Sequence, residues 1–204
     1  MHIRILAFDG ADELDFIGPL EVFRRAARLV AGVDVGLVTL APSEQVTAAY
    51  GLRVVPDGVL DDACDLLIVP GGGWASQSPL GIRTEIERGL LITTLARLHS
   101  QGTIIAGVCT GTMALAAAGL LDGRSATTHR AALPELRSTP AKVVEARVVD
   151  DGDIVTCGGV TSSLDLAHHL VQRFWGAQVS RQIADNMEFT PSPNVADRNN
   201  RHRD

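Results

Sequence analysis

The sequence predicts an α/β protein in which a mostly parallel central sheet lies between two layers of helices, a three-layer α/β/α sandwich. Two observations support this prediction. Five short apolar runs, each bounded by turn residues, have the length and the aliphatic or β-branched composition of buried strands. Longer segments with helical periodicity separate them, and such alternation favours right-handed crossovers with helices on both faces of the sheet.

The apolar runs are the expected strands of the central sheet. In chain order they are Ile3–Phe8, Val35–Leu40, Leu66–Val69, Thr103–Val108 and Ile154–Cys157. Two further segments, Arg53–Val55 and Val143–Val149, are expected to form a smaller antiparallel addition.

The expected helices are recognised by apolar side chains that recur on one face. Pro19 suits the first turn of the first helix, because a helix needs no N–H at that position. Apolar faces are formed by Leu20, Phe23, Ala27 and Val30 and by Leu91, Leu95 and Leu98, and further helices are expected over Thr110–Ala118, Ala131–Arg137, Ser163–Trp175 and Arg181–Phe189. A length of 204 residues suits one domain over residues 1–190, followed by a loose tail over 191–204 that lacks periodicity.

Composition narrows the class of partner. A net charge of −6 argues against nucleic acid or an anionic membrane as the main partner and leaves a small-molecule substrate as the better fit. The first residues have neither a signal peptide nor a membrane span, which predicts a cytoplasmic protein. Three cysteines without paired spacing suit reduced thiols, and no motif supports a metal or nucleotide cofactor.

Cys109 is the first candidate for catalysis. In open parallel sheets ligands collect where strands end, and Cys109 follows the expected strand Thr103–Val108 within the string GVCTG. This pattern resembles a nucleophile elbow, with cysteine in place of serine and with flanking glycines that allow close backbone approach. The dipole of the following helix is expected to lower the pKa of the Cys109 thiol. Cys64 and Cys157 lack this pattern and are interpreted as packing residues.

Asp15 is the second catalytic candidate. It lies between the apolar residues Leu14 and Phe16, whereas Asp12 falls in a polar loop and is interpreted as solvated. A carboxyl group in apolar surroundings has a raised pKa and can hold a proton to donate, especially beside a thiolate.

Five further residues are candidates for binding or support. Gly72 and Gly73, after the strand Leu66–Val69, could direct backbone amides at a developing negative charge together with the amide of Thr110. A plain turn is the alternative for this glycine cluster. His129 could orient groups near the elbow or serve a structural role, and Gly159, after the strand that ends at Cys157, is a further supporting candidate.

Taken together, these strings resemble the ThiJ/PfpI family of the class I glutamine-amidotransferase-like superfamily. The resemblance covers residues 3–178 and rests on DFIGPLEVF with Asp15, VPGGGW, GVCTGTMALAAAGLLDGRSATTH with Cys109, and TCGGVTSSLDLAHHLV. It implies a flavodoxin-like fold and a homodimer. Thr110 stands where family peptidases are expected to have histidine, and Asp15 stands where deglycase-like members have glutamate, so the chain is most similar to the isocyanide hydratases.

The resemblance implies a hydratase, a lyase that uses a cysteine nucleophile. Cys109 would attack an isocyanide and Asp15 would supply a proton, giving a thioimidate that water converts to an N-substituted formamide. Two alternatives stay open: a glyoxalase or deglycase-like activity on α-oxoaldehydes, and a non-enzymatic sensor of oxidants or electrophiles.

Overall fold

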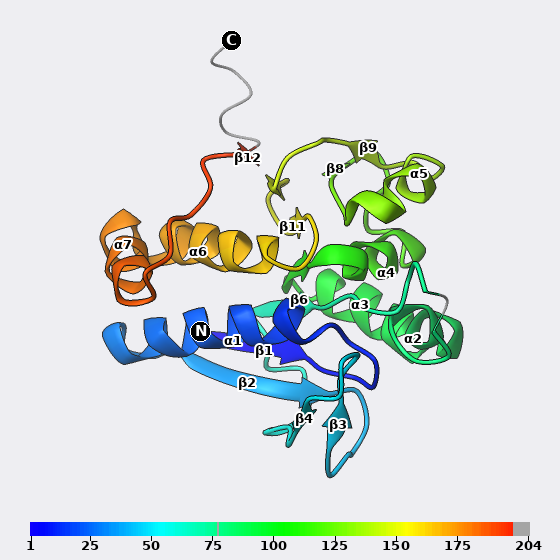
Figure 1. Cartoon of the computed structure of the whole chain (residues 1–204), viewed down its shortest axis with the longest axis horizontal. Helices are drawn as coiled ribbons and strands as arrows, with labels where there is room; N and C mark the ends of the chain where they lie inside the picture. The colour runs from blue at the N-terminus through cyan, green and yellow to red at the C-terminus, as the bar shows by residue number, and fades with distance from the viewer. Residues whose placement is uncertain (77, 198–204) are drawn as a thin grey trace.

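The computed structural model describes residues 1–76 and 78–197 and has a central sheet of eight strands (Figure 1). The sheet order is β12-β10-β11-β7-β6-β1-β2-β5. The strands comprise β1 (His2–Leu6), β2 (Asp34–Thr39), β5 (Gly58–Val59), β6 (Leu66–Val69), β7 (Ile104–Gly107), β10 (Val148–Asp150), β11 (Ile154–Cys157) and β12 (Val195–Asp197). All neighbours pair in parallel except β10 and β11. The predicted mostly parallel sheet is confirmed.

Helices cover both faces of this sheet, as predicted. On one face α1 (Glu13–Leu29), α6 (Ser162–Trp175) and α7 (Ala177–Asn186) pack together. On the other lie α2 (Ile82–Arg88), α3 (Leu90–Ser100) and α4 (Thr112–Ala117), as Figure 1 shows. The central strands β6 and β7 contribute fully buried aliphatic side chains to the core, because both their faces meet helices.

Two small two-stranded sheets lie outside the central sheet. A hairpin pairs β3 (Val46–Thr47) with β4 (Arg53–Val54), and a two-stranded parallel unit pairs β8 (Ser125–Ala126) with β9 (Lys142–Val143). Beside the latter lie two short 3₁₀ and α turns, η2 (Arg130–Ala132) and α5 (Leu133–Leu136).

The expected antiparallel addition is correct only in its first half. Residues Arg53–Val54 do pair antiparallel, with β3. The run Val143–Val149 is divided: Val143 ends β9 in a parallel pair, whereas Val148 begins β10, which pairs antiparallel with β11 but within the main sheet. One apolar run can serve two sheets because a strand needs only a partner edge, which sequence periodicity does not reveal.

The first helix begins six residues before the position predicted from Pro19. Asp12 caps α1, its side-chain Oδ1 accepting a hydrogen bond from the Leu14 amide at 3.3 Å, and Pro19 lies inside the helix. Pro19 has no N–H to donate to the carbonyl of Asp15 four residues earlier. The helix continues nonetheless because its inner face, with Phe16, is fully buried against the core.

Part of the expected loose tail is ordered. Residues Val195–Asp197 form β12, which pairs in parallel with β10, and the Ser192 amide donates to Asp165 Oδ1 at 2.6 Å. Backbone pairing at a sheet edge requires no hydrophobic periodicity, so the composition of this segment could not reveal it. Residues 198–204, the rest of the predicted tail, lie outside the described residues.

Candidate active site

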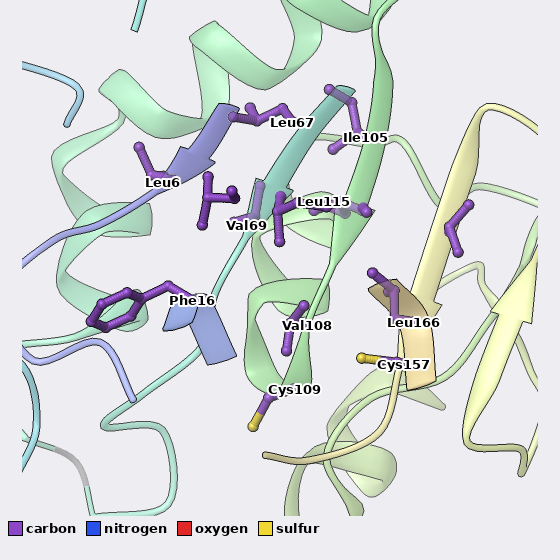
Figure 2. Close-up of a cluster of buried hydrophobic side chains, with 14 of the residues drawn as sticks. Leu6, Phe16, Leu67, Val69, Ile105, Val108, Cys109, Leu115, Cys157 and Leu166 are labelled. Atoms are coloured by element: carbon purple, nitrogen blue, oxygen red, sulfur yellow. The ribbon is translucent and has the colours of Figure 1, made fainter. Parts of the chain in front are cut away.

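Cys109 lies at a strained turn between strand β7 and helix α4. Its φ of 55° is in the left-handed region, and it opens a three-residue 3₁₀ turn, η1 (Cys109–Gly111). The Cys109 amide donates to the Gly158 carbonyl at 3.1 Å, and Thr128 Oγ1 donates to the Cys109 carbonyl at 2.8 Å. Such a conformation costs roughly 1–3 kcal/mol and persists only when its surroundings impose it. Figure 2 shows the Cys109 side chain at this turn, directed away from Val108.

The glycines of the GVCTG string have the role expected of them. A Cβ on Gly107 would lie 2.9 Å from the Thr112 Cα, and one on Gly111 would lie 2.1 Å from the Val69 carbonyl oxygen. Both distances are shorter than van der Waals contact with rigid backbone. The turn therefore packs too tightly against β6 and α4 to accept side chains at these two positions.

This packing makes Gly111→Ala strongly destabilising. We expect the free energy of unfolding to fall by about 3 kcal/mol, the upper range for overpacking, because the Val69 carbonyl cannot move without disturbing β6. Urea denaturation followed by circular dichroism measures the change. Gly58→Ala is the matched control, since a Cβ there meets nothing within 4 Å, and equal stability losses in both variants would contradict the packing argument.

Asp15 lies close to Cys109, at the start of α1. The side chain is fully buried, and Oδ2 accepts a hydrogen bond from the Gly71 amide at 2.9 Å. Its other oxygen, Oδ1, is buried and has no hydrogen-bond partner among the described residues. Burial, aided by the neighbouring Asp12 charge, raises the pKa of Asp15 to about 8, while contacts with the Gly71 amide, Cys109 and the Val160 amide partly offset the rise. Asp15 therefore holds a proton at neutral pH, as its apolar neighbours predicted.

The expectation that the pKa of the Cys109 thiol is lowered is wrong. Burial raises the pKa of the Cys109 thiol to about 12, and the neighbouring Asp15 charge adds to the rise. Backbone amides of Val160 and Thr110 act in the opposite direction but do not outweigh burial. A group only 6% exposed loses most of its hydration, so burial opposes the thiolate more strongly than the amides of the short 3₁₀ turn favour it.

Val160 is a site residue that sequence reasoning missed. Its φ of 42° is an outlier for a β-branched residue, and its amide faces both Cys109 and Asp15. Strain at such a residue directs an N–H group into the site, beside the amide of Thr110. The only available signal was its place in the string CGGVTSS, between β11 and α6, where a strand end meets a helix.

The glycine loop 71–73 supports the site, but its amides are largely engaged. Gly71 donates to Asp15 Oδ2, and Gly72 donates to Thr110 Oγ1 at 3.1 Å. A Cβ on Gly73 would meet the Leu80 carbonyl oxygen at 2.5 Å, which places Gly73 against the following loop. The loop therefore positions Asp15 and Thr110. The Thr110 and Val160 amides are the donors that face the Cys109 sulfur.

His129 and Gly159 lie against each other beside the elbow. A Cβ on Gly159 would lie 2.2 Å from His129 Cδ2, and His129 Nδ1 accepts a hydrogen bond from the Ala131 amide at 3.2 Å. His129 also acts electrostatically on Asp12, a half-buried carboxylate whose pKa burial raises. The interpretation of Asp12 as a solvated residue is therefore wrong, because the folded chain half-buries Asp12 and brings it near His129.

Cys64 and Cys157 are buried and free, and burial raises the pKa of both thiols. Cys157 lies within the apolar cluster of Figure 2, and Cys64 donates to the Leu66 carbonyl at 3.3 Å. Within residues 1–76 and 78–197 no group of His, Cys, Asp and Glu side chains could hold a metal ion. In the same residues no helix combines the length and the apolar composition that a membrane span requires.

The raised pKa of Asp15 has a consequence for stability. Both folded and unfolded states hold the Asp15 proton below about pH 3.8, but between 3.8 and about 8 only the folded state holds it. The unfolded state then gains by ionising, so wild-type stability falls as pH rises through this window. Asp15→Asn removes this loss. We expect the stability of the variant relative to wild type to be greater at pH 7 than at pH 4 by about 4 kcal/mol, in urea titrations at both pH values. A difference that does not change with pH would contradict the raised pKa.

The sheet order and the cysteine turn define the class of protein: a flavodoxin-like α/β protein with a cysteine elbow at the carboxyl end of a central strand. The chain belongs to the DJ-1/PfpI family, whose model matches residues 1–173. This membership confirms the resemblance found in the sequence.

Named relatives show how varied this family is. The isonitrile hydratase of Pseudomonas putida is 33% identical over 95% of this chain and 80% of its own length. The Parkinson disease protein 7 homolog of Danio rerio is 30% identical over 88% and 92%. The HTH-type transcriptional regulator GlxA of Rhizobium meliloti is 35% identical over 79% of this chain but only 49% of the regulator. Among solved structures, Drosophila melanogaster DJ-1beta has a TM-score of 0.78 at 25% identity, covering 93% of this chain and 98% of its own.

Proposed function

We propose that this protein hydrates isocyanides to N-substituted formamides, with Cys109 as nucleophile and Asp15 as proton donor. The observation that carries the proposal is the buried pair itself: a cysteine at a strained elbow beside a carboxyl group that keeps its proton at neutral pH. Similarity to the isonitrile hydratase of Pseudomonas putida over most of both chains supports the substrate class.

The first half-reaction adds the thiol across the terminal isocyanide carbon. Asp15 donates its proton to that carbon, which becomes electrophilic, and the Cys109 sulfur forms a bond to it as the thiol proton passes to the Asp15 carboxylate. Asp15 ends protonated again, so the net result is the transfer of the thiol proton to the isocyanide carbon. This sequence needs no free thiolate at rest, in agreement with the raised pKa of the Cys109 thiol.

The second half-reaction consumes the thioimidate. Water adds to the carbon of the C=N bond, one of its protons reaches the nitrogen, and the C–S bond breaks while sulfur regains a proton. The products are the N-substituted formamide and free Cys109. The amides of Thr110 and Val160 lie where they would stabilise negative charge on sulfur as it leaves.

A panel of alkyl and aryl isocyanides tests the proposal. Formamide production, followed by chromatography and mass spectrometry, is the expected result with wild type. Absence of formamide from every member of the panel would sink the assignment. Methylglyoxal serves as the parallel substrate: lactate formation without isocyanide turnover would favour the glyoxalase or deglycase-like alternative.

The sensor alternative is tested by oxidation. A sensor requires a reactive thiolate, whereas the raised pKa of the Cys109 thiol keeps it neutral and slow to oxidise. We expect peroxide titration followed by intact mass to show little oxidation of Cys109 at neutral pH. Rapid oxidation confined to Cys109, in a protein that turns over no substrate, would favour the sensor.

We also propose a homodimer in the cytoplasm. The dimer rests on family resemblance, and the location rests on three cysteines that are all free. Sedimentation at micromolar concentration should give a dimer-sized species, and a strictly monomer-sized species would overturn the dimer.

A further inference from the structure

A cavity of about 530 Å³ lies directly beside the Cys109 elbow. Its wall includes Thr128, His129, Arg130, Arg147, Gly159 and Val160. This volume lies within the range of small-molecule binding pockets, which is roughly 300–1,000 Å³. Its walls carry hydroxyl, guanidinium and amide groups, so it suits a polar ligand better than a hydrocarbon chain.

The cavity shares its wall with the reacting centre. Thr128 donates to the Cys109 carbonyl at 2.8 Å, and Gly158, another lining residue, accepts from the Cys109 amide at 3.1 Å. Val160 lines the cavity while its amide faces the Cys109 sulfur. Cys109 itself does not line the cavity, and these three residues connect the cavity wall to the elbow.

The fixed charges of the cavity leave an excess positive charge at Arg130. Arg147 is neutralised by the buried Asp165, whose Oδ2 accepts from Arg147 Nε at 2.7 Å, and Glu145 is paired with Arg137. Arg130 is exposed and has no ion-pair partner in the part of the chain that the structure describes. In a protein of net charge −6, the guanidinium of Arg130 is a local positive charge that can attract an anion.

His129 adds a second donor on the same wall. Because its Nδ1 accepts from the Ala131 amide, the neutral ring carries its proton on Nε2, on the side of Gly159. His129 and Arg130 thus add an N–H donor and a guanidinium to the lining of one cavity, and both kinds of group bind carboxylates.

We propose that the substrates are isocyanides that carry a carboxylate, and that Arg130 binds this carboxylate in the cavity while the isocyanide carbon meets Cys109. This inference rests on the proposed hydratase function and adds the substrate class to it. Arg130 then determines specificity and takes no part in proton transfer. The product is an N-formyl amino acid or a longer formamido acid.

Matched substrates test the inference by kinetics. Isocyanoacetate and its methyl ester differ only in the charge of the carboxyl group, and wild type should favour the acid in kcat/KM by about tenfold, through KM. Arg130→Gln should bring this ratio near one, Arg130→Lys should restore part of it, and Arg53→Gln, an exposed arginine on β4, should preserve it. A ratio near one in wild type, or the same ratio in Arg130→Gln, overturns the inference and leaves the hydratase proposal standing.

A binding measurement separates the two proposals. N-formylglycine, the product of isocyanoacetate hydration, should bind wild type in isothermal titration and should bind Arg130→Gln about tenfold more weakly. Its methyl ester should bind neither protein well. This result supports the carboxylate site even where isocyanides are not turned over, in which case only the hydratase proposal fails. Equal binding of acid and ester, or no binding of either, overturns the site.

Discussion

Cys109→Ala should abolish isocyanide hydration, with turnover falling to the level of buffer alone. Covalent catalysis depends on the sulfur atom, and alanine provides no group that could form the thioimidate. In wild type, intact mass during turnover should show an adduct of the substrate's mass, and tandem mass spectrometry should assign it to Cys109. Formamide production under saturating substrate measures the loss, with circular dichroism as the check on folding.

Cys157→Ala and Cys64→Ala are the matched controls for this loss. Both thiols are buried and carry pKa values raised by burial, so they differ from Cys109 in position and in their lack of a strained turn. Each variant should retain most of the wild-type turnover and lose about 1 kcal/mol of stability from the vacated volume. An active Cys109→Ala protein would refute the nucleophile.

Asp15→Asn should lower turnover at pH 7 by about 100-fold or more, the lower end for general acid–base catalysis. Asparagine can keep the hydrogen bond from the Gly71 amide through its carbonyl oxygen, but it has no transferable proton. The wild-type pH profile should carry the same information. Asp15 loses its proton at about pH 8, so kcat/KM should be level below that pH and fall above it. The variant should lack this fall.

Asp12→Asn is the control for the charge of the site. Asn can still cap α1, and the change removes a negative charge that raises the pKa of Asp15. The descending limb of the profile should therefore move to lower pH, while turnover at pH 6 stays within about threefold of wild type. A wild-type rate that rises through pH 8 would show instead that the ionised pair is the active form, and unchanged turnover in Asp15→Asn would refute the proton donor alone.

Local sequence patterns determined most of the central architecture. The apolar runs Leu66–Val69 and Ile154–Cys157 coincide with β6 and β11, because buried strands are set by short-range composition and bounding turns. The spacing of Gly107, Cys109 and Gly111 indicated the elbow for a similar reason: a tight turn needs small residues at fixed places. The apolar residues beside Asp15 predicted its burial, and one of them, Phe16, is fully buried in the core.

Only the tertiary structure decided the chemistry of the site and the edges of the sheet. The pKa of the Cys109 thiol depends on burial and on Asp15, which lies 94 positions earlier in the chain. The helix end next to Cys109 therefore could not predict the direction in which this pKa shifts. The strained Val160 amide enters the site because β11 and α6 hold it there. β12 forms because one edge of β10 pairs with β11 and leaves the other edge available for a further strand. Desolvation, charge and backbone pairing are exerted between segments distant in sequence, and they take effect only once the chain has folded.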